Sequence, residues 1–347
     1  MAYESQKMLT PGDLLDDKGQ LAQCGYATSL VKEYDRSKIK AGKLRIKEWD
    51  YYCITGKECV LCLTIADNSY MSLDSISLLF PDKHTQIQKS MMDLMTLGRV
   101  GLPASSKQGD VKVQKKGYTL SFLNDGTKRV LDVHLDDFNG GRPLTAHVEL
   151  TDEPRDSMVI ATPFTGHPRH FYYNQKINCL RASGDVSFGG ETYTFSPETD
   201  MAVLDWGRGV WTYSNTWYWG SLSTVCDGKA VGLNLGYGFG DTSAATENML
   251  FVDGVAHKLE HVTFEIPKNA AGSDDFMKPW RIHDNDGRLD LTFEPVLDRT
   301  DCTSVLVIES DQHQVFGYMT GVAVTDEGEE IRIDHALGFA EKVKNRW

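Results

Sequence analysis

Short segments in which apolar and polar residues alternate recur along most of this chain, and they constrain its fold more than any other feature. Side chains point alternately to the two faces of a β-strand, so a period of two predicts strands with one buried face. Eight segments show the pattern: residues 61–65, 118–122, 130–135, 145–150, 230–235, 289–293, 305–308 and 331–334.

Glycine-containing dipeptides separate many of these segments. They are Asp125-Gly126, Gly140-Gly141, Gly189-Gly190, Asp227-Gly228, Asp253-Gly254 and Asp286-Gly287. Such pairs adopt the positive φ angles that tight hairpin turns require. Many short strands joined by hairpins predict an all-β protein of antiparallel barrels or sandwiches with little helix. Helical spacing is confined to residues 83–97, which also fit an extended segment, and to residues 275–280.

The length of 347 residues suggests two domains. Residues 162–170 are interrupted by proline and glycine and carry no strand pattern, and a new hairpin begins at residue 186. We therefore predict an N-terminal β-domain over residues 1–184, which includes the inter-domain segment, and a C-terminal β-domain over residues 185–347.

The formal net charge of −13 argues against nucleic acid or an anionic membrane surface as a partner, because both bind basic surfaces. No early segment combines a basic start with an apolar run, so we expect no signal peptide. No run of about 18 apolar residues could cross a bilayer, so we also expect no membrane span. A small molecule remains the expected partner.

The seven cysteines are odd in number and scattered along the chain. Cys59 and Cys62 have the C-x-x-C spacing of zinc and redox motifs. They lie in an apolar run typical of a buried strand, with no second pair, no nearby histidine and no helix start after them. We interpret them as buried, reduced thiols, which indicates a cytoplasmic protein.

Four of the seven tryptophans fall within residues 205–219. They are Trp206, Trp211, Trp217 and Trp219. A tryptophan ring buries a large apolar area, whereas its N–H usually needs a partner. Strand alternation places Trp217 and Trp219 on one face together with two serines. We interpret this face as the wall of a ligand cavity; plain core packing of the rings is the alternative.

Polar residues next to this cluster are candidates for binding or catalysis. Asn234 lies between two glycines of an alternating strand, where a ligand can approach the backbone closely. Asp205 and Glu247 are candidate catalytic acids, since an apolar tryptophan wall would raise the pKa of either carboxyl. Arg208 would instead keep Asp205 ionised, and a solvated strand edge is the alternative for Glu247. The predicted ligand-binding residues here are Trp206, Arg208, Trp217, Trp219, Asn234 and Asn248.

The inter-domain segment adds titratable residues. His167, Arg169 and His170 lie in it, and Tyr173 follows. Ligand clefts often form between domains, so we predict that His167 and Tyr173 close the ligand site. The two histidines have no further ligand pair at metal-binding spacing, and we predict no metal site. Nucleotide-binding glycine motifs and a nucleophile elbow are also missing from the sequence, which predicts no cofactor.

Three segments resemble a bacterial family known as domain-of-unknown-function family 2804. They are residues 9–19, 204–209 and 217–259, and the likeness extends over nearly the whole chain. More remotely, the tryptophan-rich segment is similar to the lipocalin-like group that includes carotenoid 1,2-hydratase, tocopherol cyclase and kievitone hydratase. The resemblance implies two lipocalin-like β-barrel domains with a ligand cavity at or near their junction. It also implies cofactor-free acid catalysis, in which a carboxylic acid protonates an alkene and aromatic faces stabilise the cation.

The leading functional hypothesis is therefore a cofactor-independent hydratase, cyclase or isomerase that acts on a largely apolar small molecule. A non-catalytic carrier of a hydrophobic ligand is the first alternative. A carbohydrate-active enzyme is the second, because tryptophan platforms beside carboxylates also suit sugars.

Overall fold

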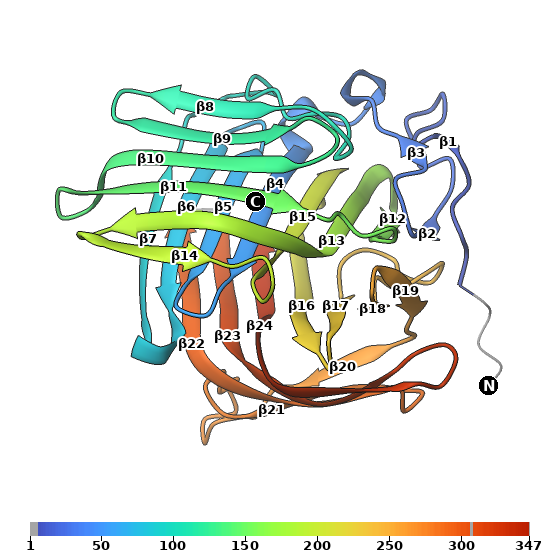
Figure 1. Ribbon diagram of the computed structural model, residues 1–347. Coiled ribbons are helices and arrows are strands. Elements are labelled where there is room, and N and C mark those ends of the chain that lie inside the picture. The colour runs from blue at the N-terminus through green and yellow to red at the C-terminus, as the bar shows by residue number, and fades with distance from the viewer. Residues whose placement is uncertain (1–5, 306–307, 347) are drawn as a thin grey trace.

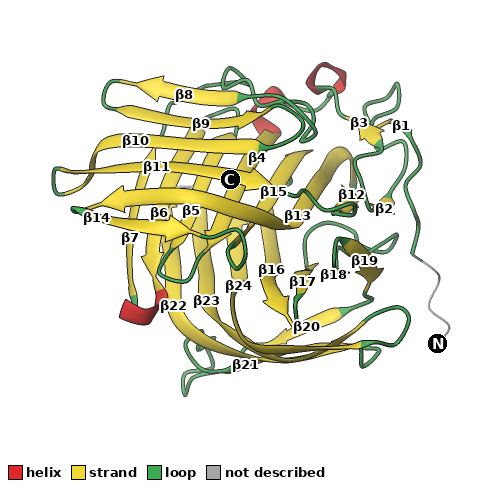
Figure 2. Ribbon diagram, viewed as in Figure 1, coloured by secondary structure: helices red, strands yellow, loops and turns green. Residues whose placement is uncertain are grey.

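The computed structural model describes residues 6–305 and 308–346, so residues 306 and 307 of the predicted strand over 305–308 lie outside it. Strands dominate these residues, and Figure 2 shows helix only as short pieces. The helical elements of the described residues are three 3₁₀ turns, Arg36–Lys38 (η1), Lys43–Arg45 (η2) and Pro81–Lys83 (η3). The prediction of an all-β protein is confirmed.

The first large sheet is antiparallel and takes its strands from the first two thirds of the chain. Its main path runs β7-β6-β5-β4-β15-β13-β11-β10-β9-β8, and β2, β12 and β14 pair beside it. The strands are β2 (Gly25–Ala27), β4 (Ile46–Thr55), β5 (Val60–Asp67), β6 (Ser72–Phe80), β7 (Thr85–Met91), β8 (Val111–Lys115), β9 (Tyr118–Asn124), β10 (Arg129–Asn139), β11 (Arg142–Thr151), β12 (Met158–Phe164), β13 (His167–Phe188), β14 (Glu191–Phe195) and β15 (Met201–Val210).

The second large sheet is also antiparallel, in the order β19-β18-β17-β16-β24-β23-β22-β21-β20. Its strands are β16 (Ser214–Cys226), β17 (Lys229–Tyr237), β18 (Met249–Val252), β19 (Val255–Lys258), β20 (Val262–Glu265), β21 (Trp280–Asp284), β22 (Leu289–Val305), β23 (Ile308–Val324) and β24 (Glu330–Arg346). A separate parallel pair joins β1 (Gly12–Asp13) to β3 (Lys32–Glu33).

Both large sheets are curled, and they lie against each other (Figure 1). In the first, β8 to β11 and β13 cross in front of β4, β5 and β6. In the second, the long strands β22, β23 and β24 bend away from the first sheet toward the base of the view. The chain passes between sheets after Val210 and before Ser214, further along than the domain boundary predicted near residue 185, because β13 continues through that position.

The turn dipeptides behave as the sequence predicts. Both residues of Asp227-Gly228 and of Asp253-Gly254 have positive φ, and each pair joins two neighbouring antiparallel strands. The two segments with helical spacing contain no α-helix: residues 83–97 contribute strand β7, and residues 275–280 form a turn that leads into β21. Pairing with β6 stabilises the extended form of β7.

Alternation in the first sheet separates two cores. In β4, Tyr52 and Ile54 point into the core enclosed by the first sheet, whereas Tyr51 and Cys53 point the other way. These last two pack with Trp219, Phe316 and Phe339 of the second sheet. The outer face of the first sheet is therefore buried against the second, and any cavity between the two sheets is lined by residues of both.

Two further findings concern the described residues only. Among residues 6–305 and 308–346, no helix has the length and apolar character needed to cross a membrane. Cys59 and Cys62 are both buried and carry no disulfide.

Candidate active site

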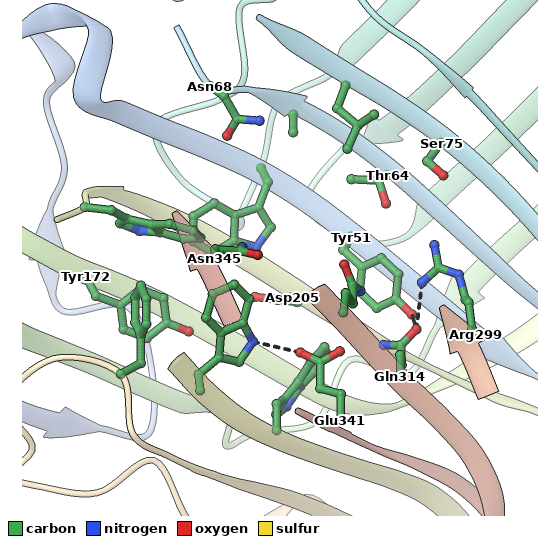
Figure 3. A pocket seen from close by; sticks show the side chains of 18 of the residues that line it. Tyr51, Thr64, Asn68, Ser75, Tyr172, Asp205, Arg299, Gln314, Glu341 and Asn345 are labelled. Carbon is green, nitrogen blue, oxygen red and sulfur yellow. Dashed lines mark hydrogen bonds between the residues drawn. The ribbon is translucent and has the colours of Figure 1, made fainter. Parts of the chain in front are cut away.

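A cavity of about 210 Å³ lies between the two sheets (Figure 3). Strands β4, β5, β6, β7, β13 and β15 supply its residues from the first sheet, and β16, β22, β23 and β24 supply them from the second. Phe239 and Glu247 come from the connection between β17 and β18. The walls combine aromatic rings with a few charged groups, which is the usual composition of a small-molecule site.

One end of the cavity is an aromatic box. Its members are Trp49, Tyr172, Trp211, Trp217 and Phe239. Trp49 stacks on Tyr172 with ring centroids 6.2 Å apart, and Trp211 meets Trp49 edge-on at 5.2 Å. Phe239 completes the box with edge-on contacts to Trp211 and Trp217 at 4.9 and 5.3 Å. The rings support one another, so this end of the cavity is preformed for an apolar group.

Strand register explains how the first sheet aims polar groups into the cavity. Six residues on neighbouring strands are direct cross-strand partners, and we call them the first row: Lys176, Asp205, Tyr51, Thr64, Ser75 and Ser90. Direct partners share a face of the sheet, so all six side chains face the same way. All six line the cavity. Ser90 at the end of the row is exposed, which places the cavity mouth at β7.

The second sheet contributes a matching line of partners, which we call the second row: Trp219, Glu341, Gln314 and Arg299. All four line the cavity as well. The tyrosine hydroxyl of Tyr51 donates to Oε1 of Gln314 at 3.3 Å, which links the two rows. At the other end, the ammonium of Lys176 lies 3.8 Å from the ring centroid of Trp219. The two rows therefore face each other across the cavity.

Glu341 lies at the centre of this arrangement. Its Oε1 accepts a hydrogen bond from the indole N–H of Trp217 at 2.8 Å, drawn as a dashed line in Figure 3. Burial raises the pKa of the Glu341 carboxyl to about 7, although the Trp217 N–H and the Lys176 charge act in the opposite direction. A carboxylic acid with a pKa near neutrality is suited to general acid catalysis.

Glu247 is the second buried glutamate of the cavity. Its carboxyl group packs over Gly236, where an added Cβ would lie 2.6 Å from Cδ of Glu247. Burial raises the pKa of Glu247, and the Lys176 and Asn234 side chains oppose that shift. Gly236, in the alternating strand β17, thus leaves the space that the Glu247 carboxyl occupies beside the cavity.

Asp205 has a different environment from both glutamates. Its Oδ2 forms an ion pair with Nζ of Lys176 at 2.8 Å, and its Oδ1 accepts a hydrogen bond from Asn174 at 2.6 Å. All three side chains are buried. A carboxylate held by a cation and an amide is suited to orienting Lys176, whereas donating a proton would require breaking the pair.

The family model described as Domain of unknown function (DUF2804) matches residues 5–347. The chain belongs to this family. No curated protein sequence matches it significantly.

Two solved structures share the fold of this DUF2804 chain. A protein from Nitrosomonas europaea assigned as AttH has a TM-score of 0.55 at 13% identity, with 90% of this chain and 96% of the other covered. Kievitone hydratase from Nectria haematococca has a TM-score of 0.50 at 11% identity, with 98% of each chain covered. At such identities the likeness shows the fold alone, and it confirms the lipocalin-like β architecture.

The structure of the DUF2804 chain brings several predicted site residues together. Asp205, Glu247, Trp217 and Trp219 all line the cavity. Asn234 is fully buried just behind the wall, where it accepts the Trp219 N–H at 2.8 Å and donates to the Glu247 backbone carbonyl at 2.8 Å.

Three other predicted residues lie outside the cavity. Asn248 is fully buried and bridges backbone groups of Gly236 and Glu260. Trp206 and Arg208 point to the opposite face of β15 from Asp205, into the core of the first sheet. There the Arg208 guanidinium pairs with Asp50 at 3.0 Å. The cation beside Asp205 is therefore Lys176 and not Arg208.

The two predicted residues of the inter-domain segment also lie away from the cavity lining. His167 is exposed at the start of β13 and stacks on His170 with centroids 5.0 Å apart. Tyr173 is buried in the core enclosed by the first sheet, and its hydroxyl donates to the backbone carbonyl of Lys32 at 2.9 Å. Its neighbour Tyr172 points to the other face of the strand and lines the cavity instead.

Sequence reasoning missed three charged residues of the cavity: Lys176, Arg299 and Glu341. Lys176 lies in a stretch of β13 that is buried throughout residues 171–180, but the neighbouring Asn174, Gln175 and Asn178 hide that burial in the sequence. Glu341 and Arg299 offer no local signal either. Within the described ranges, no group of three or more histidine, cysteine, aspartate or glutamate side chains could hold a metal ion.

Proposed function

We propose that this protein is a cofactor-independent enzyme of the hydratase or isomerase type, acting on a largely apolar small molecule, with Glu341 as the general acid. The observation that carries the proposal is the environment of Glu341. Its carboxyl is buried at the centre of the second row, its pKa is raised to about 7, and it faces a cavity with an aromatic box at one end.

The proposed chemistry begins with transfer of the Glu341 proton to one carbon of a substrate double bond. The electron pair of the π bond forms the new C–H bond, and the other carbon becomes cationic. The ring of Trp217 and the other rings of the aromatic box are placed to stabilise such a cation. Addition of water and return of a proton to the carboxylate then complete a hydration. Transfer of a neighbouring proton from the cation to the carboxylate, with formation of a new double bond, instead completes an isomerisation.

Other residues have supporting roles in this proposal. Glu247 is a second buried carboxyl that can accept or return the proton, because its pKa is also raised. The Lys176–Asp205 pair fixes a positive charge against the Trp219 face. Kievitone hydratase, one of the proteins with this fold, has a name that indicates addition of water, which is compatible with the proposed class.

An untargeted labelling experiment tests whether the protein is an enzyme of this type. A small-molecule extract of the source organism is incubated with the protein in oxygen-18 water or in heavy water and analysed by mass spectrometry. Hydration appears as a product that gains one labelled water, and isomerisation appears as a product of unchanged formula that contains deuterium.

Two matched tryptophan variants of β7 test whether the labelled products depend on this cavity. Ser90→Trp places an indole at the exposed end of the first row and is expected to abolish labelled products. Thr85→Trp, on the same strand but outside the cavity lining, is expected to leave them unchanged. If the wild type yields no labelled product but co-purifies with a small molecule, the protein is a carrier and the catalytic proposal is wrong. Labelled cleavage products of a sugar would favour the carbohydrate alternative.

A further inference from the structure

Arg299 is the feature of the cavity that the proposed acid chemistry leaves unused. Its guanidinium is buried in the cavity wall and lies near the mouth. Nη1 donates to Oε1 of Gln314 at 2.7 Å, and Nε lies 3.2 Å from Oγ of Ser77 and 3.1 Å from Oε1 of Gln88. All of these acceptors are uncharged.

The second cation of the cavity has a different environment. Lys176 forms an ion pair with Asp205 at 2.8 Å, whereas none of the ion pairs among residues 6–305 and 308–346 includes Arg299. A buried charge without an ion-pair partner is costly, so a ligand of opposite charge would stabilise the Arg299 guanidinium. Glu341 and Cys62 act on this guanidinium electrostatically, whereas its hydrogen bonds within the described residues go to Gln314, Ser77 and Gln88.

The guanidinium also has unused hydrogen-bonding capacity. Arginine has five N–H donors, and the protein acceptors described above engage only those on Nε and Nη1. The geometry of a guanidinium matches that of a carboxylate, which accepts two parallel hydrogen bonds from it. Ser75 and Ser90 of the first row add neutral hydroxyl groups to the same side of the cavity.

The second row fixes the position of this charge relative to the acid. Arg299, Gln314 and Glu341 are consecutive cross-strand partners on β22, β23 and β24. Two strand spacings separate the backbones of Arg299 and Glu341, which is about 10 Å. Figure 3 shows Arg299 and Gln314 side by side, with Glu341 beyond Gln314.

We propose that Arg299, held by Gln314, is a binding subsite for a monoanionic oxygen group, and that the substrate is an unsaturated apolar acid. A carboxylate at Arg299 would direct the apolar part of the molecule toward Glu341 and the aromatic box. This inference rests on the proposed function only for the statement that the ligand is a substrate. The binding of an anion at Arg299 stands independently of catalysis.

The test uses two fluorescent probes with the same ring system. One is 8-anilinonaphthalene-1-sulfonate, an anion, and the other is N-phenyl-1-naphthylamine, its neutral counterpart. The protein carries a net charge of −13, so general electrostatics would disfavour the anion. We nevertheless expect the wild type to bind the anionic probe more tightly than the neutral one in fluorescence titrations.

The informative variant is Gln314→Glu, which gives Arg299 a carboxylate partner without removing the arginine from the wall. We expect it to weaken binding of the anionic probe at least tenfold and to change binding of the neutral probe less than twofold. Gln114→Glu, exposed on β8, adds the same charge away from this cavity and is expected to change neither. Circular dichroism checks that both variants are folded.

The inference is overturned if the wild type does not prefer the anionic probe, or if Gln314→Glu weakens both probes equally. Neither readout depends on turnover. A protein that gives no labelled product can still prefer the anionic probe. A catalytically active protein can also give labelled products and show no preference for the anionic probe. The two proposals are therefore tested separately.

Discussion

Trp217 donates its indole N–H to Oε1 of Glu341 at 2.8 Å, and the two residues come from adjacent strands of the second sheet. The contact fixes the carboxyl within the cavity and satisfies an indole that would otherwise lack a partner. It also links the tryptophan-rich segment to the residue that we propose as the acid. The consequences for stability and catalysis are measurable.

The first consequence is that the stability of the fold depends on pH through Glu341. The pKa of Glu341 is raised from 4.5 to about 7 in the folded protein, so between these values the folded state holds a proton that the unfolded state has lost. The free energy of unfolding therefore falls as pH rises through this window, by on the order of 3 kcal/mol in total from this group. The free energy of unfolding is measured with urea at about pH 5 and at about pH 8. We expect the Glu341→Gln variant to lack the fall between these two values that this carboxyl causes in the wild type.

The control is Glu330→Gln, an exposed residue of the same strand. It should retain the pH dependence of the wild type. Equal pH dependence in the wild type and in Glu341→Gln would show that the carboxyl does not titrate as described.

The second concerns the buried pair of Lys176 and Asp205. Removing one partner leaves a buried charge unpaired, and we expect Lys176→Met to lower the free energy of unfolding by about 3 kcal/mol or more. The double variant Lys176→Met/Asp205→Leu should recover most of that loss. The exposed pair Lys229–Glu329 is the control, and Lys229→Met should cost less than about 1 kcal/mol. A loss that is equally small for both lysines would contradict the assignment.

The third concerns Gly207, which makes room for a ring of the aromatic box. A Cβ at this position would lie 1.9 Å from Cζ2 of Trp49. We expect Gly207→Ala to lower the free energy of unfolding by about 2 kcal/mol and to displace the Trp49 ring, which a change in tryptophan fluorescence would report. Gly42→Ala is the control, since nothing lies within 4 Å of an added Cβ there. An unchanged emission spectrum in Gly207→Ala would argue against a tightly packed box.

Local alternation in the sequence was sufficient to predict part of this site. It correctly placed Trp217 and Trp219 on one face. The same rule also separates Asp205 from Arg208, because residues three apart in a strand point to opposite faces. The pairing of Arg208 with Asp50 depends in addition on the register between β15 and β4, which local alternation does not give.

The remaining parts depend on register between distant strands. Lys176 meets Asp205 because β13 pairs with β15, and Glu341 lies beside Trp219 because β24 pairs with β16. Neither pairing is readable from local patterns, since both join segments far apart in the chain. The second row, and with it the proposed acid, becomes visible only when the sheet order is known.

The most direct test of the central claim is the turnover of Glu341→Gln on a substrate recovered by the labelling experiment. A general acid contributes roughly 10²–10⁴-fold to the rate. We expect kcat to fall at least a hundredfold with little change in KM, while Glu330→Gln retains wild-type kcat. A Glu341→Gln variant that turns over the substrate within about twofold of the wild-type rate would contradict the account.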